Sequence, residues 1–286
     1  MQPRQNIEFT DHDITGRKGI RKTNFLSDIH IDAAYVLLRN LRDSIGGMYN
    51  CRFGEEAKFP KAEGDKWMQI IHNGSNHWIL ATKGFFKEKK QVPLQTVEVF
   101  DSCANKELTN NFSTCSIASL LRTEDESFYI DYLNCQQQKN DYDCGVFAIA
   151  FATCLLMGQN PLKKTFRQSE LRAHLKKCLI DRELTMFPND DAKFPTVSVL
   201  RNEYVEVHCY CRRPAFRNRT RKLEKMLVCK ACSYQFHPTC ENDKICFDKK
   251  GNFTCSMCLQ KQNKEDREKK ELLKNIGKKI VFDDSD

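Results

Sequence analysis

A cysteine at the predicted start of an apolar helix is the most reactive group that the sequence offers. Cys144 follows the polar stretch 138–143 and precedes Gly145 and the apolar run 146–157. A helix N-terminus presents unpaired N–H groups and the positive end of the helix dipole, and both favour the thiolate form of cysteine. The sequence therefore predicts that Cys144 is a nucleophile.

A thiolate nucleophile needs a base and a group that orients the base, and the chain offers one of each. His77 opens one β-like run and Asp101 closes another. Neighbouring strands would bring these two ends together, so His77 could move protons while Asp101 holds the imidazole. Gln138, six residues before Cys144, could donate its side-chain N–H to a developing oxyanion.

The last third of the chain contains a second group of reactive side chains. Seven cysteines and one histidine stand there in closely spaced pairs: Cys209, Cys211, Cys229, Cys232, His237, Cys240, Cys255 and Cys258. Eight such ligands make two tetrahedral metal sites, and a module this small needs metal to stay folded. Disulfides are the alternative, but the chain is long for a disulfide-stabilised mini-protein and begins without the pattern of a secretory signal.

The elements that must position these residues follow from hydrophobic spacing and from turn residues. Ser27 is a candidate N-cap for an amphipathic helix. β-like runs are expected at 67–71, 78–82, 96–100 and 128–133, and helices at 29–41, 108–121, 146–157 and 167–179. This mixture predicts an α+β domain. The expected organisation is a flexible arm at 1–24, a catalytic domain at 25–190, a linker at 191–203, a metal-binding finger at 204–260 and a charged tail at 261–286.

The order His, Asp, Gln, Cys and its local motifs resemble the Ulp/SENP family of ubiquitin-like-modifier proteases. The matching stretches are 25–28, 76–78, 99–102 and 138–147. The resemblance implies a papain-like, Ulp-type cysteine peptidase domain that needs no cofactor. It implies the roles of nucleophile for Cys144, base for His77, orienter for Asp101 and oxyanion donor for Gln138.

The same resemblance implies a substrate and two residues that hold it. The expected reaction is cleavage after the C-terminal glycine of a ubiquitin-like modifier such as SUMO. In the family two tryptophans line the tunnel for the modifier's Gly-Gly tail. Trp78 matches one of them, and Phe25 stands where the other is expected. An aromatic lid over the tail is therefore expected here.

The order and spacing of the eight ligands resemble a PHD-type zinc finger. The resemblance implies interleaved sites for two structural Zn²⁺ ions, with Cys209, Cys211, His237 and Cys240 at one and Cys229, Cys232, Cys255 and Cys258 at the other. Phe236 and Phe253 match the family's small aromatic core. Gln235 occupies the usual position of the cage tryptophan. We therefore expect the finger to contact an unspecified protein or nucleic acid rather than to bind methyl-lysine on a histone tail.

The distribution of charge along the chain indicates which kinds of partner the protein could bind. The net charge of +8 lies almost entirely beyond residue 200. This excess suits an acidic partner such as nucleic acid, although a solvated basic surface is the more frequent explanation. The sequence contains no apolar run long enough for a membrane helix. An intracellular protein, nuclear or cytoplasmic, is expected. Two other functions stay open, namely a viral- or transposon-type cysteine endopeptidase or acyltransferase, and a non-catalytic chromatin-binding adaptor.

Overall fold

The computed structural model describes residues 8–86, 95–104, 111–193, 198–217, 222–241 and 246–280. It divides into two compact units. The first unit comprises Met1–Val207 together with Arg212–Leu223, and the second comprises His208–Cys211 together with Glu224–Asp286. Each unit is described here by itself.

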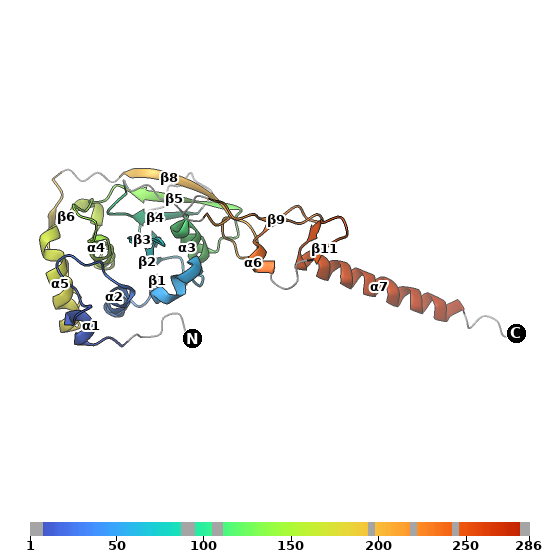
Figure 1. The fold of residues 1–286 in the computed structure, drawn as a ribbon, viewed down its shortest axis with the longest axis horizontal. Coiled ribbons are helices and arrows are strands. Elements are labelled where there is room, and N and C mark those ends of the chain that lie inside the picture. Colours follow the sequence, from blue (N-terminus) through green and yellow to red (C-terminus); the bar gives the residue numbers. More distant parts are fainter. Residues whose placement is uncertain are drawn as a thin grey trace. The chain divides into compact units, whose positions relative to one another are not determined.

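A six-stranded mixed sheet forms the centre of the first unit (Figure 1). Its strands, in spatial order, are β1 (Gly46–Gly47), β2 (Trp67–His72), β3 (Trp78–Lys83), β4 (Thr96–Phe100), β5 (Ser127–Leu133) and β8 (Val199–Glu206). Strand β3 pairs antiparallel with both β2 and β4, and β4 pairs parallel with β5. The antiparallel pairing of β3 and β4 brings the start of one strand to the end of the other.

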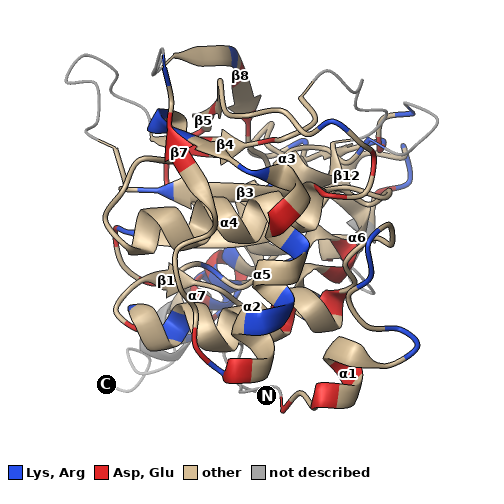
Figure 2. Cartoon of the chain, turned by 90° about the vertical axis from the view of Figure 1, so that its left-hand side faces the viewer, with Lys and Arg blue, Asp and Glu red and all other residues tan. Residues whose placement is uncertain are grey.

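Helices cover both faces of this sheet, because successive side chains of each strand point to opposite sides. Leu80 of β3 packs with the helices α2 (Asp28–Leu41), α4 (Cys144–Leu156) and α5 (Gln168–Asp181), whereas Ile79 and Ala81 pack with α3 (Phe112–Leu121). Every residue of α4 is buried. Accordingly it carries no charged side chain, whereas α2 and α5 do (Figure 2).

Short elements complete the first unit. They are α1 (Asp11–Thr15), the 3₁₀ helices η1 (Cys51–Ala57) and η2 (Pro161–Lys163), and the two-stranded pair β6 (Lys164–Phe166) and β7 (Asn189–Asp191). The predicted strands and helices are therefore present, with ends that shift by a few residues. Residues 1–7 of the predicted arm, 108–110 of one predicted helix, 194–197 of the predicted linker and 281–286 of the tail lie outside the described residues.

The predicted flexible arm is wrong for residues 8–24, because this segment belongs to the core. Phe9, Ile14 and Ile20 are buried in the same cluster as α4. Thr10 and Asp13 cap the start of α1 reciprocally, and the Arg182 guanidinium lies 3.8 Å from the centre of the Phe9 ring. Three apolar residues spaced five or six apart give no helical or strand period, so the pattern offered no signal.

The predicted linker 191–203 and the predicted start of the finger are also wrong, because residues 199–206 form the edge strand β8. It pairs antiparallel with β5, from Ser127 opposite Glu206 to Leu133 opposite Val199. The segment after Cys211 also returns to the first unit, where the Arg212 guanidinium donates to the Thr123 and Glu124 carbonyls at 2.8 and 2.7 Å. Most residues of β8 are polar, because one of its faces is solvated. Its composition is therefore that of a linker, which is why the sequence pattern did not reveal the strand.

This arrangement predicts the outcome of a truncation. A fragment that ends at Asp190 lacks β8, so it exposes the edge of β5 and loses the buried Val205 and Val207, which contribute about 1.5–3 kcal/mol each. We expect its thermal midpoint to fall by at least about 10 °C, or the fragment to aggregate. A fragment that ends at Leu223, with serine at Cys209 and Cys211, is the control. Equal midpoints in calorimetry would contradict the assignment of β8 to the catalytic domain.

The second unit is small and its core is aromatic. It contains β9 (Leu227–Val228), β10 (Gln235–Phe236), α6 (Pro238–Glu241), β11 (Cys246–Phe247), β12 (Phe253–Thr254) and α7 (Ser256–Ile280). Phe236 and Phe253 are buried among cysteine side chains. The buried Glu241 carboxylate accepts a hydrogen bond of 3.0 Å from the Ser256 N–H at the start of α7. Over the described residues, no helix combines the length and the apolar character that a membrane crossing requires.

Candidate active site

His77 and Asp101 lie side by side, as expected from neighbouring strands. His77 immediately precedes β3 and Asp101 immediately follows β4. The His77 Nε2 atom is 2.7 Å from Asp101 Oδ1, and the two residues are only 5% and 6% exposed. The same carboxylate oxygen accepts a hydrogen bond of 2.8 Å from the Cys103 N–H. These contacts fix the carboxylate, which in turn fixes the imidazole.

Cys144 is the first residue of α4 and is 1% exposed. Burial lowers the pKa of His77, but hydrogen bonds and charge interactions with Asp101 and Cys144 raise it more, to about 9. Asp101 occupies Nε2, so Nδ1 is the nitrogen that serves Cys144. With a pKa of about 9, the imidazole is protonated on both nitrogens at neutral pH. Its hydrogen bond with Cys144 then brings a positive charge to the sulfur at the positive end of α4.

The raised pKa of His77 allows a test of the role of the Asp101 carboxylate. The imidazolium–carboxylate pair stabilises the folded state fully below the unfolded-state value of 6.5, and this contribution is lost as the pH rises through about 9. In Asp101→Asn we expect kcat/KM to fall on the order of a hundredfold or more. The alkaline limb of its pH profile should move from about 9 toward 6.5. Asp131→Asn on β5 is the control, and an unmoved limb in Asp101→Asn would contradict the pairing.

A cavity with several aromatic residues in its lining includes Trp78, the residue after His77. It has a volume of about 440 Å³, and its lining includes Phe25, Leu26 and Trp78. The Trp78 indole N–H donates to the Leu26 carbonyl at 2.9 Å. A Cβ atom on Gly145 would lie 3.0 Å from Leu26 Cβ and 3.2 Å from Trp78 Cδ1. The structure therefore brings Phe25 and Trp78 to one cavity, and Leu26 and Trp78 of its lining lie close to Gly145, the residue after Cys144.

Gln138 is held in the turn that leads to Cys144. Its side-chain oxygen accepts a hydrogen bond of 2.8 Å from the Ser102 hydroxyl, and its amide nitrogen donates to the Asn140 carbonyl at 2.5 Å. Its backbone N–H donates to the Ser102 carbonyl at 2.7 Å. Since Ser102 follows Asp101 directly, these bonds tie the nucleophile turn to the end of β4.

Sequence reasoning missed two residues beside the nucleophile. Asp143 and Arg172 are both buried and form an ion pair with Nε to Oδ1 at 2.5 Å. A signal was present, because Arg172 stands between Leu171 and Leu175 on the buried stripe of α5. A charged residue on an apolar stripe needs a buried partner, and Asp143 is that partner.

The second unit gathers the eight predicted ligands into two groups. Within the described residues, Cys209, Cys211, His237 and Cys240 form one group and Cys229, Cys232, Cys255 and Cys258 form the other, with the ligand atoms of each group within 4.8 Å of one another. Cys211 Sγ lies 3.3 Å from His237 Nδ1, and His237 Nε2 lies 4.0 Å from the Glu224 carboxylate. Both groups could hold a metal ion.

Comparison with known proteins identifies the catalytic part. Residues 56–182 match the family model described as the Ulp1 protease family, C-terminal catalytic domain. No curated protein sequence matches the chain.

Solved structures that match part of the chain include the SUMO protease Ulp1 with its catalytic cysteine oxidised to a sulfenic acid. It is 17% identical over 59% of this chain and 84% of that chain, with a TM-score of 0.39. The C-terminal Ulp1 protease domain in complex with Smt3, the yeast orthologue of SUMO, is 16% identical over 55% and 77% of the two chains with a TM-score of 0.36. The Ulp1-like SUMO protease catalytic domain of Chaetomium thermophilum is 19% identical over 59% and 76% with a TM-score of 0.39.

The family model covers β2 to β5 and α3 to α5, and thus His77, Asp101, Gln138 and Cys144. It ends before β8 and before the second unit. The assignment rests on this match. The chain is therefore a cysteine peptidase that carries a catalytic domain of the Ulp1 protease type.

Proposed function

We propose that the chain cleaves peptide or isopeptide bonds after the C-terminal glycine of a ubiquitin-like modifier. One observation carries the proposal: the paired His77 and Asp101 face a cysteine at the start of a buried helix, beside an aromatic cavity. The matched family and the SUMO-processing activity of the similar proteins support the modifier as the substrate class.

The proposed reaction divides into acylation and hydrolysis. The Cys144 thiolate attacks the carbonyl carbon of the terminal glycine, and the resulting oxyanion accepts hydrogen bonds from the Cys144 N–H and the second N–H of the Gln138 amide. Protonated His77 gives its proton to the departing amine, which leaves a thioester. His77, now neutral, takes a proton from water as the water attacks the thioester, and the thiolate leaves again with the carboxylate product.

Close packing around Gly145 holds two residues of the cavity lining beside the nucleophile turn. Leu26 and Trp78 are tied by a hydrogen bond of 2.9 Å, and both approach Gly145 so closely that one added methyl group would touch them. Phe25, which is 45% exposed, is placed to cover the tail from the solvent side.

A panel of modifiers with a C-terminal electrophile tests this function. We expect the SUMO-type modifier to form a covalent adduct at Cys144, detected by mass spectrometry, and the matched modifier with alanine at both terminal glycines to form none. The protein could instead form no adduct with any ubiquitin-like modifier and yet cleave a viral-type peptide or transfer an acyl group. That result would favour the alternative endopeptidase or acyltransferase. Modifier binding without any adduct would favour the adaptor.

We also propose that the second unit is a PHD-type finger with two structural Zn²⁺ ions. The donor sets Cys₃His and Cys₄ suit tetrahedral zinc, and the Glu224 carboxylate near His237 Nε2 is the usual partner of a metal-bound imidazole. The finger would direct the peptidase to a protein or nucleic-acid partner. The Lys230 ammonium is paired with the Asp248 carboxylate at 2.6 Å, which offsets its repulsion toward a basic histone tail.

A further inference from the structure

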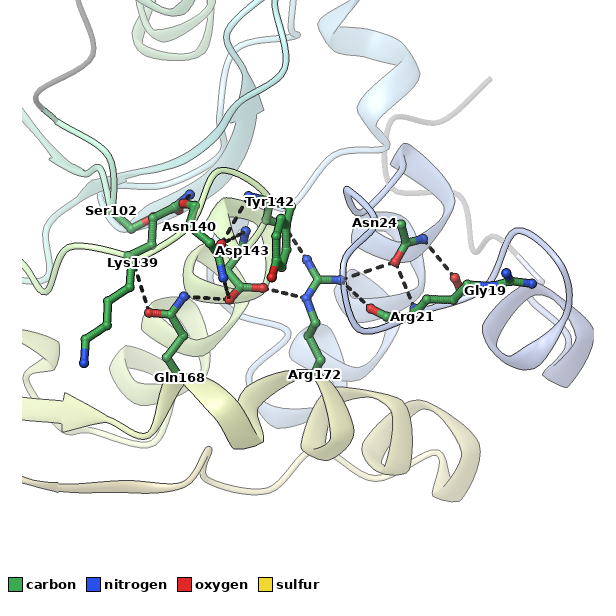
Figure 3. A network of polar contacts seen from close by, with 11 residues as sticks. Gly19, Arg21, Asn24, Ser102, Lys139, Asn140, Tyr142, Asp143, Gln168 and Arg172 are labelled. Atoms are coloured by element: carbon green, nitrogen blue, oxygen red, sulfur yellow. Dashed lines mark hydrogen bonds and ion pairs between the residues drawn. The ribbon is translucent and has the colours of Figure 1, made fainter.

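A buried ion pair includes Asp143, the residue that directly precedes the proposed nucleophile Cys144. Asp143 precedes Cys144 in the chain and Arg172 reaches it from α5 (Figure 3). The side chains of Arg172 and Asp143 are only 10% and 5% exposed. A carboxylate one residue from a thiolate disfavours that thiolate through like charge, and burial strengthens the effect. The guanidinium supplies the opposite charge at 2.5 Å.

The same contacts turn the Asp143 carboxylate away from α4. Asp143 is the N-cap of this helix but makes no side-chain hydrogen bond to it. Its Oδ2 instead accepts from the Asn140 and Gln168 amides, each at 2.7 Å. An N-cap aspartate ordinarily binds the N–H groups of the first helical turn. With the carboxylate held elsewhere, the Asp143 side chain does not occupy those N–H groups.

Arg172 also joins the nucleophile turn to the segment that precedes the cavity wall. Its Nη1 donates to the Arg21 carbonyl at 3.0 Å and lies 3.4 Å from the Asn24 side-chain oxygen. Asn24 in turn accepts a hydrogen bond of 2.9 Å from the Arg21 N–H. The next residue is Phe25, at the cavity. One planar guanidinium thus contacts both parts of the site, a geometry that lysine cannot reproduce.

We propose that Arg172 is a positioning residue of the active site, which cancels the charge of Asp143 and orients the turn so that Cys144 reacts as a thiolate at neutral pH. The proposal rests on the proposed role of Cys144 as nucleophile. The charged groups around the sulfur are His77 and Asp101 from the sheet, Asp143 and the exposed Asp141 from the turn, and Arg172 from α5 through Asp143.

The test is the pH dependence of the alkylation of Cys144 by iodoacetamide in the full chain, followed by mass spectrometry of the peptide that contains it. In Arg172→Met we expect the midpoint of the profile to rise by roughly one pH unit, with about a tenfold slower reaction at pH values well below both midpoints. In Asp143→Asn the midpoint should fall, because the arginine charge is now unopposed. The double variant should return close to the wild-type midpoint.

Arg182→Met is the matched control. Arg182 also ties α5 to the N-terminal segment, through a 2.9 Å hydrogen bond to the Phe9 carbonyl, but it does not contact Asp143. We expect this variant to lower the thermal midpoint and leave the alkylation profile unchanged. A merely structural role for Arg172 would give the same result in Arg172→Met, and this result would overturn the proposal.

Two further outcomes are decisive. If Arg172→Met does not fold, Asp143→Asn decides alone, since an unchanged midpoint there contradicts the charge argument and a lower one supports it. If Cys144 of the wild-type protein reacts no faster than the other thiols and no modifier is cleaved, the proposed function fails and this proposal fails with it. A reactive wild type with unshifted variants contradicts only the role of Arg172.

Discussion

Replacing Cys144 with alanine is expected to reduce hydrolysis of a modifier's C-terminal amide on the order of 10⁴-fold or more. The reaction depends on a thiolate at the start of α4, where His77 and the helix end stabilise the charge. The measurement is kcat/KM on a fluorogenic modifier amide, with modifier affinity measured separately by calorimetry. Affinity should persist, because the cavity residues are unchanged.

Cys154 provides a matched control on the same helix. Burial raises the pKa of the Cys154 thiol to about 12, so this thiol is a poor nucleophile at neutral pH. Cys154→Ala should cost stability through the cavity it leaves and retain most of the activity. Full activity in Cys144→Ala, or its loss in a folded Cys154→Ala, would contradict the assignment of the nucleophile.

Removal of metal is expected to unfold the second unit and to leave hydrolysis in place. Structural zinc contributes about 10–16 kcal/mol to such small domains, far more than the burial of Phe236 and Phe253. The four proposed catalytic residues lie in the first unit. After treatment with a chelator we therefore expect loss of the near-ultraviolet circular dichroism of the second unit, with kcat/KM within a factor of about two.

Metal content gives the control. The wild-type chain should hold two zinc ions, while Cys211→Ser and Cys229→Ser should each weaken a different site because the two residues belong to different groups. Cys103→Ser, outside both groups, should keep both ions. A wild-type chain that purifies without zinc from zinc-containing medium, or a folded second unit in the presence of chelator, would contradict the proposal.

The sequence was most informative where chemistry constrains spacing. The pairing of His77 with Asp101 followed from their places at strand ends, and the two groups of metal ligands followed from the resemblance of their spacing to a known finger. Both depend on local pattern and on short-range order. The long buried helix was equally visible, because residues 146–157 are apolar without interruption.

Features that depend on tertiary context were missed. Strand β8 is stabilised by its hydrogen bonds to β5 rather than by its own composition, and the segment 8–24 is held by a few large side chains spread over the core. The ion pair of Arg172 with Asp143 joins residues from separate elements. No window of sequence contains both partners of such contacts, so the stripe of α5 could signal a buried charge at Arg172 but could not identify its partner.

The discontinuity of the first unit has a consequence for the exchange of domains. The chain leaves this unit after Val207, supplies Cys209 and Cys211 to the second unit, returns for Arg212–Leu223 and leaves again. A single recombination breakpoint would separate the first ligand pair from the rest of its site or remove the returning segment from the peptidase. A functional chimera must therefore transfer 208–211 and 224–286 as two pieces with three junctions. The two units would thus be inherited together far more readily than two domains joined by a simple tether.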